Sequence, residues 1–287
     1  MDSFAHCEAL VRAADKDRFL AGLFAPATKR RHLYALYAFN AEIARVREVI
    51  RTPMAGEIRL QWWRDALGAA ASRSAAEPPL QGDVRANPVA DALMTTIVGC
   101  RLPVEPLLAL IEARSFDLYD DPMPSLDALY GYVRKTSSSL IALGALVLGG
   151  GPDPIAAGLA GPAGIGLGLA RLLQAFPVHA GRHQLYLPLE LLDRFDVTPA
   201  DIFAGKATRQ LQTVLADLRA RARLELDQVT SNRGGIPAAT LPAFLPAALA
   251  RPLLTRLEDE AADPFNPVTI PQWRRQWTLW RAARRGL

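Results

Sequence analysis

The chain has few residues of the kinds that hold small secreted domains or metal centres together. It contains only two cysteines, Cys7 and Cys100, and four histidines among 287 residues. The two cysteines show neither the spacing of a metal site nor a disulfide framework. We therefore interpret both as small apolar residues of a protein in a reducing compartment.

An excess of charge of one sign is also absent. The 33 basic and 29 acidic residues give a net charge of +4, which by itself does not predict nucleic-acid binding. Half of the residues are apolar and 22% are charged, a balance that provides for a large core and argues against disorder.

Long uninterrupted apolar runs are missing as well. The two longest, Leu140–Gly149 and Ile155–Leu173, are broken by glycine or proline, and the opening residues lack the apolar core of a signal peptide. The glycines at 158, 161, 164, 166 and 168 favour close helix packing inside a protein. We therefore expect a soluble, cytoplasmic protein with no transmembrane segment.

No stretch alternates apolar and polar residues with the period of a strand, so we predict an all-α protein. A central helix is predicted to begin near Pro26 and to end before Pro53, because apolar residues recur at three- and four-residue steps at Leu33, Leu36, Tyr37, Ile43 and Val46. Further helices are predicted after Asn87, from Ser125 through Tyr132 to Gly149, and from Pro154 to Pro177. An exposed connection is predicted at Ala69–Asp83, and with no repeat and no composition boundary residues 1–287 are predicted to form one domain.

Four tracts carry a resemblance to a known family: LFAPATKRRHLYALYAF at Leu23–Phe39, IEARSFDL at Ile111–Leu118, YVRKTSSSLIALGALVLG at Tyr132–Gly149, and GLGLARLLQAFPVHAGRHQLYLPLELLDRF at Gly166–Phe195. Their words and order resemble the squalene/phytoene synthase family. The resemblance implies an isoprenoid-synthase helical bundle around a central apolar cavity. It also implies chemistry on two prenyl diphosphates, whose charge Mg²⁺ ions held by paired aspartates neutralise.

The sequence departs from the family where those aspartates belong. The DDxxD motif aligns with Ala44–Glu48, which retains one carboxylate at Glu48 and adds positive charge at Arg45 and Arg47. The DxxxD motif aligns with Ala175–His179 and has no carboxylate. We therefore predict no catalytic residue, no metal and no cofactor. The chain looks most like the degenerate branch that includes the mitochondrial complex I assembly factor, which implies an assembly or lipid-handling role.

The resemblance also implies a set of residues for a retained pocket. These candidates, taken from the matching tracts, are Arg45, Glu48, Asp117, Tyr132, Lys135 and Gln174. A simpler interpretation stays open beside it. In that interpretation Arg114 and Asp117 form a pair on a helix surface and Tyr132 is a core aromatic.

Other functions stay open at this point. One is a prenyl transferase of the phytoene or squalene synthase type, using Mg²⁺ or binding diphosphate directly through Arg45, Arg47 and Lys135. Another is a carrier of isoprenoid or quinone in the apolar cavity. A zinc site at His179 and His183 is not predicted, because Pro177 and Gly181 argue against a regular helix there.

The C-terminal tail, residues 271–287, combines aromatic and basic residues without any acid. We mark as a membrane or partner surface Trp273, Arg274, Arg275, Trp277, Trp280 and Arg281. Such a helix either rests on an anionic membrane or packs its tryptophans on the protein body, and we favour packing. The resemblance implies an isoprenoid or other lipid and a protein of respiratory-complex assembly as partners. The tail adds the inner face of a membrane, and nucleic acid is not expected as a partner.

Overall fold

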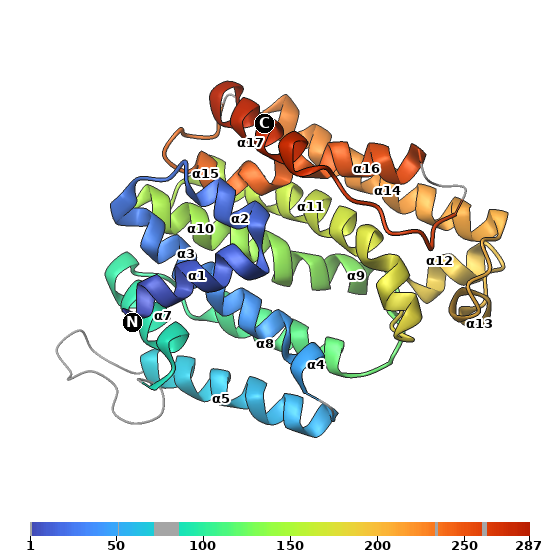
Figure 1. The fold of residues 1–287 in the computed structure, drawn as a ribbon, viewed down its shortest axis with the longest axis horizontal. Helices are drawn as coiled ribbons and strands as arrows, with labels where there is room; N and C mark the ends of the chain where they lie inside the picture. Colours follow the sequence, from blue (N-terminus) through green and yellow to red (C-terminus); the bar gives the residue numbers. More distant parts are fainter. Residues whose placement is uncertain (1, 51, 72–85, 233–234, 260–262) are drawn as a thin grey trace. The chain divides into compact units, whose positions relative to one another are not determined.

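The computed structural model describes residues 2–50, 52–71, 86–232, 235–259 and 263–287. Within these ranges every regular element is a helix, which confirms the predicted all-α class (Figure 1). From residue 72 onward the connection predicted at Ala69–Asp83 lies outside the described residues.

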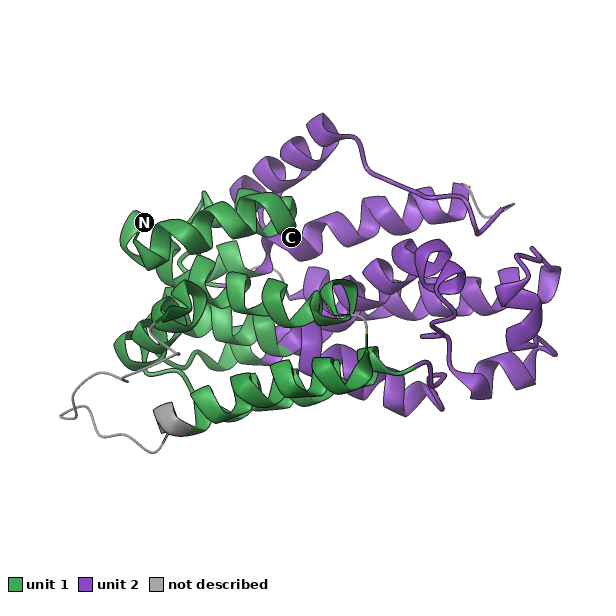
Figure 2. Ribbon diagram, turned by 60° about the horizontal axis from the view of Figure 1, so that its bottom comes forward, with its two compact units in different colours: residues 1–119, 139–157, 237–243 green, residues 120–138, 158–236, 244–287 purple. Residues whose placement is uncertain are grey.

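The chain folds into two compact units, each assembled from separate stretches of sequence (Figure 2). The first unit comprises residues 1–119, 139–157 and 237–243. The second comprises residues 120–138, 158–236 and 244–287. The tracts that match the family are thus divided between the units.

The first unit is built around one nearly buried helix. Its helices are α1 (Ser3–Ala14), α2 (Lys16–Gly22), α3 (Ala27–Ala44), α4 (Val46–Val49), α5 (Pro53–Ala71), α7 (Pro88–Cys100), α8 (Glu105–Ser115), η1 (Phe116–Leu118) and α10 (Ser139–Gly149). Helix α3 packs against α1, α7 and α10, which explains why its residues from His32 to Ala41 are all buried. The apolar pattern of this segment therefore marks the centre of the unit.

The predicted central helix was wrong at its C-terminal end. Helix α3 ends at Ala44, because Arg45 adopts φ −96° and ψ 2°, and α4 starts at Val46. Pro53 does not close a helix but begins α5, where its missing N–H is not needed. The break falls inside the segment that aligns with the DDxxD motif.

The second unit contains the longest helix of the chain. Its helices are α9 (Leu126–Val133), the π-helical turn η2 (Arg134–Ser138), α11 (Pro154–Gly181, from residue 158 onward), α12 (Leu189–Arg194), α13 (Pro199–Phe203), α14 (Arg209–Ser231), η4 (Leu245–Leu249), α16 (Ala250–Asp259) and α17 (Gln272–Arg285); the short α15 (Leu241–Phe244) joins the two units. The single helix predicted to run through Tyr132 to Gly149 was wrong, because η2 separates α9 from α10. A π-helical turn of this kind frequently marks a functional site.

Glycines let α11 approach its neighbours closely, as predicted. At Gly164 an added Cβ would overlap the main chain of Ser138 in η2. At Gly166 it would lie 2.6 Å from Leu226 Cγ on α14. Gly164 and Gly166 are thus required where η2 and α14 cross the helix, whereas an added Cβ at Gly158 or Gly161 would meet no atom within 4 Å.

The predicted end of α11 at Pro177 was also wrong. The helix continues through Pro177 to Gly181 although proline removes one backbone hydrogen bond. Phe176 and Ala180 on either side are both buried, so tertiary packing holds this turn in the helical conformation.

Among the described residues α11 alone has the length and apolar composition to cross a membrane. In the 18-residue window that meets this criterion, 61% is buried inside the protein, as in a core helix.

Candidate functional site

The charged side chains of the segment aligned with the DDxxD motif contact other residues of the protein. Arg45 and Glu48 pair at 3.6 Å and are about half exposed, at 56% and 48% of their side-chain surface. Arg47 Nη1 donates to the carbonyl oxygens of Asp117 and Leu118, at 3.3 and 2.8 Å. Arg47 therefore fastens α4 to η1.

Asp117 lies on the same structural element as these carbonyl groups. Its carboxylate is buried and accepts a hydrogen bond from Arg114 Nη1 at 2.9 Å. The Arg114–Asp117 pair of the simpler interpretation is therefore formed, but with Asp117 buried and Arg114 half-buried rather than both exposed on a helix surface. The charges of Arg114 and Asp117 in the segment from α8 to η1 therefore offset each other.

The segment aligned with the DxxxD motif lies on the last turns of α11 in the second unit. Gln174 donates its Nε2 to the carbonyl oxygen of Val268 at 2.9 Å and so ties α11 to the segment before α17. Lys135 is exposed on η2. Tyr132 is buried with its ring centroid 5.5 Å from that of Tyr186.

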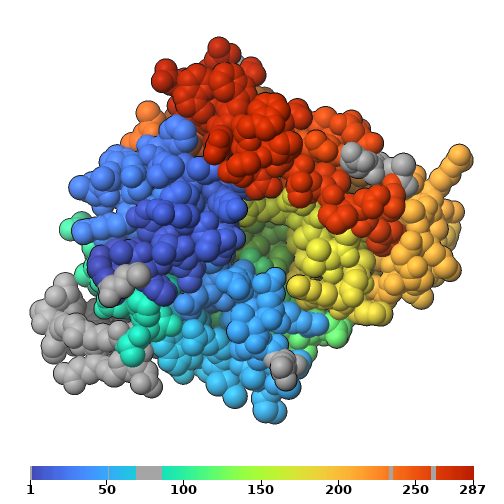
Figure 3. Space-filling view, in the orientation of Figure 1, coloured from blue at the N-terminus to red at the C-terminus, as the bar shows by residue number. Residues whose placement is uncertain are grey.

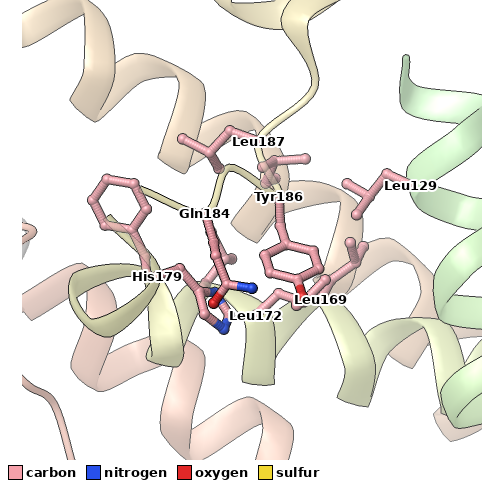
Figure 4. A pocket seen from close by; sticks show the side chains of 10 residues that line it. Leu129, Leu169, Leu172, His179, Gln184, Tyr186 and Leu187 are labelled. Atoms are coloured by element: carbon pink, nitrogen blue, oxygen red, sulfur yellow. The ribbon is translucent and has the colours of Figure 1, made fainter. Parts of the chain in front are cut away.

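A small cavity in the second unit contains polar groups that were not among the predicted pocket residues. It has a volume of about 20 Å³, room for roughly one water molecule, and leucines form much of its wall. His179, Gln184 and Tyr186 also line it, and the ring of His179 lies 4.5 Å from that of Tyr186 (Figure 4). The YLPLELL tract contains Tyr186, but nothing in the sequence pattern places Gln184 in the interior.

The two histidines considered for zinc are in different environments. His179 lies in α11, so the expectation of irregular backbone there was wrong. His183 follows the helix with a left-handed φ of 57°, and its ring packs 4.8 Å from that of Phe203. Among the residues that the structure describes, no group of three His, Cys, Asp or Glu side chains is arranged to hold a metal ion.

A magnesium cluster, which the fold family implies, can be tested against these donors. Mg²⁺ prefers near-octahedral oxygen ligands, supplied largely by carboxylates. In the first unit Glu48 is held by Arg45, and in the second Gln174 turns its amide nitrogen toward a carbonyl group. These side chains do not fit a magnesium cluster.

The first unit also carries an open groove with a volume of about 440 Å³. Its apolar walls come from α1, α3 and α4, and its polar rim from α3 and α5; the lining residues are Leu10, Ala41, Glu42, Arg45, Val46, Val49, Ile50 and Arg59. Arg59 pairs with Glu42 at 3.1 Å across the rim. The sequence pattern did not indicate either of these two residues, because they belong to separate helices.

The C-terminal helix α17 does not pack its tryptophans on the protein, contrary to the expectation we favoured. Trp273, Trp277 and Trp280 are 69%, 56% and 42% exposed, and the segment that carries them lies at the surface (Figure 3). Leu279 and Ala282 are its buried residues. Helix α17 packs on η4, and its tryptophans lie outside that contact.

The helical architecture is that of an isoprenoid-synthase type of protein, as its similarity to solved synthase structures shows. The squalene/phytoene synthase family model matches residues 11–281, and the chain belongs to this family. The resemblance inferred from the four tracts is confirmed.

The relatives of the chain include assembly factors and enzymes. It is 30% identical over 266 residues to "NADH dehydrogenase (ubiquinone) complex I, assembly factor 6" of Rattus norvegicus, covering 93% of this chain and 77% of that protein. It is 24% identical over 296 residues to the 15-cis-phytoene synthase of Synechococcus elongatus, covering 97% and 91%. Among solved structures, squalene synthase HpnC of Alicyclobacillus acidocaldarius superposes with a TM-score of 0.77 at 25% identity, covering 92% of this chain and 95% of that one.

Proposed function

We propose that this chain is a non-catalytic member of the family and serves as an assembly or lipid-handling factor for respiratory complex I. We place it at the inner face of a membrane, as a peripheral protein on the cytoplasmic side. The similarity to the rat assembly factor over 93% of the chain supports this proposal.

The observation that carries the proposal is the pair of hydrogen bonds that Arg47 donates. Its guanidinium donates to two main-chain carbonyl oxygens within its own unit, so the motif segment serves to join α4 and η1. In an enzyme with the family's chemistry, this segment would hold metal ions facing a diphosphate. A fixed cation there opposes the binding of Mg²⁺, because like charges repel.

The neighbouring residues support the same conclusion. Glu48, the one carboxylate in the aligned segment, is about half exposed and pairs with Arg45 at 3.6 Å. Gln174, beside the second aligned segment, holds the segment before α17 and presents no acid. These contacts within the protein support the proposal that neither segment holds metal ions.

The catalytic part of the proposal is tested with the purified chain, farnesyl or geranylgeranyl diphosphate and Mg²⁺. We expect no pyrophosphate release above background, and Glu48→Gln to behave as the unchanged protein does. Pyrophosphate release at an enzyme-like rate, about 1 s⁻¹ or more, that Glu48→Gln abolishes would refute the non-catalytic assignment.

The assembly part is tested in the host organism. Deletion of the gene is expected to lower the NADH dehydrogenase activity of isolated membranes and the amount of assembled complex on native gels. Complementation by the Glu48→Gln variant is expected to restore both. Unchanged complex I in the deletion strain contradicts the assembly role.

A carrier of isoprenoid or quinone is a second candidate, which the groove on the first unit favours. Its walls are apolar and Arg45 lies at its rim, whereas Arg47 is bound to carbonyl groups and Lys135 lies in the other unit. Only one of the three cations considered for metal-free diphosphate binding therefore lines the groove. Val49 lines the groove and is 70% exposed, so its substitution tests whether the groove binds an isoprenoid.

The carrier is tested by lipid extraction and mass spectrometry of the purified chain. We expect a co-purifying isoprenoid that Val49→Asp reduces, with Val98→Asp, an exposed valine on α7, as the matched control. A diphosphate affinity that is insensitive to EDTA but lost in Arg45→Ala shows that the diphosphate head group of the isoprenoid binds at the rim of the groove. A chain free of isoprenoid excludes the carrier.

A further inference from the structure

Helix α17 presents two opposite sides. Leu279 and Ala282 are buried against the second unit, where α17 packs on η4. Trp277 and Trp280 each precede one of these residues by two positions, which on an α-helix is a rotation of about 200°. Trp277 and Trp280 therefore lie away from the face of α17 that packs on η4.

The exposed side is an ordered ridge. The rings of Trp277 and Trp280 stack with centroids 5.0 Å apart at an interplanar angle of 22°, and the Arg284 guanidinium lies 4.9 Å from the Trp280 centroid. Trp273 lies one turn before Trp277 on the same side. Three exposed indoles in a row are unusual on a protein surface and mark an interaction site.

The charge of the helix is of one sign. From Gln272 to Leu287 the sequence contains five arginines and no acid. Arg274 and Arg281 flank the tryptophan ridge and line a groove of about 490 Å³ together with Trp273 and Trp277. The opposite wall of this groove is formed by α14 and the η4–α16 segment, including Arg251.

We propose that α17 docks on a bilayer containing anionic phospholipid. The tryptophan ridge lies at the depth of the head groups, where indole rings are favoured, and Arg274 and Arg281 contact lipid phosphates. The groove between α17 and α16 receives a head group with the start of its acyl chains. This inference deepens the peripheral location proposed above and rests on it, because it names the element that binds the membrane.

The indole geometry favours lipid over nucleic acid. Bases stack on aromatic faces that are open to them. Here Trp277 and Trp280 stack on each other, and Arg284 lies over Trp280. A ridge of mutually stacked indoles flanked by arginines matches the amphipathic boundary of a bilayer better than a strand of bases.

The test is co-flotation of the full chain with vesicles of phosphatidylcholine alone or with 30 mol% phosphatidylglycerol, a composition of roughly one anionic lipid in three. We expect binding to the anionic vesicles only. Arg274→Gln/Arg281→Gln is expected to lower the vesicle partition coefficient about tenfold or more. Trp273→Gln/Trp277→Gln/Trp280→Gln is expected to abolish flotation.

The matched control is Arg12→Gln/Arg194→Gln, which removes the same charge from exposed positions outside α17. It is expected to float as the unchanged chain does, and thermal unfolding of every variant verifies that the fold is retained. Equal loss in the control and in the Arg274/Arg281 variant refutes the assignment to α17, as does preference for a homopolymeric RNA over anionic vesicles. If the tryptophan variant still fractionates with membranes in cells, the peripheral location stands and α17 is not its docking element.

Discussion

Replacing Gly164 by alanine tests the close crossing of α11 and η2. An alanine Cβ there would overlap the Cα, N and Oγ of Ser138, far inside the roughly 3.5 Å of an ordinary carbon contact. Two of these three atoms belong to the main chain, so rotation of the Ser138 side chain cannot relieve the overlap. The helix would have to move as a whole.

The magnitude follows from two opposing terms. Overpacking of an interior costs about 1–3 kcal/mol, and main-chain overlap places this site toward the upper end. The higher helix propensity of alanine returns up to about 1 kcal/mol. We therefore expect a net loss of about 2 kcal/mol, which corresponds to a decrease in Tm of about 4–8 °C.

Gly158 provides the control on the same helix. A Cβ there meets no atom within 4 Å, so Gly158→Ala has only the propensity term and is expected to raise Tm by about 2–4 °C. Differential scanning calorimetry of both variants decides the result. If Gly164→Ala is as stable as Gly158→Ala, α11 does not lie against η2 as described.

Three further predictions concern the first unit. Arg47→Gln is expected to lower the free energy of unfolding by about 1.5–3 kcal/mol in urea titrations, because its carbonyl partners lose a charged donor. Arg45→Gln is expected to change it by less than about 1 kcal/mol, and equal effects of the two variants contradict the assigned contacts. Burial lowers the pKa of His32 below its ordinary 6.5, so as the pH drops the unfolded chain takes up this proton before the folded chain does. The free energy of unfolding should therefore fall as the pH drops below about 6.5. His32→Gln should flatten this decline, and a variant with an unchanged pH profile contradicts the role of His32. Burial raises the pKa of the Cys7 thiol to about 12 and also raises that of Cys100, which is less buried. Iodoacetamide should therefore label Cys100 first in the native protein, and faster labelling of Cys7 contradicts its burial.

Local signals in the sequence were sufficient for much of the fold. Asn87 and Pro88 predicted the start of α7, and Asn87 Oδ1 accepts hydrogen bonds from the amides of Val89 and Ala90 at 2.9 and 3.1 Å. The glycines of α11 predicted close packing, and Gly164 packs closely, although the sequence did not indicate that its neighbour would be η2. Signals of this kind act over one or two helical turns, so no other part of the chain is needed to interpret them.

The candidate site was less accessible, because its contacts join residues far apart in the chain. The spacing around Arg47 does not indicate that the carbonyl groups of Asp117 and Leu118 would receive its donors. Likewise nothing near Gln174 points to Val268. The residue types at the aligned positions could be read from the sequence, but their present partners could not.

The sequence by itself determined that the chain is helical, that it belongs to the squalene/phytoene synthase family, and that its tail joins tryptophan with arginine. Only the tertiary structure decided that α3 breaks at Arg45, that α11 continues past Pro177, and that the tail turns its tryptophans outward. Composition and periodicity record which side chains a helix has. Which of them are buried depends on the elements that pack against it, and these come from distant parts of the chain.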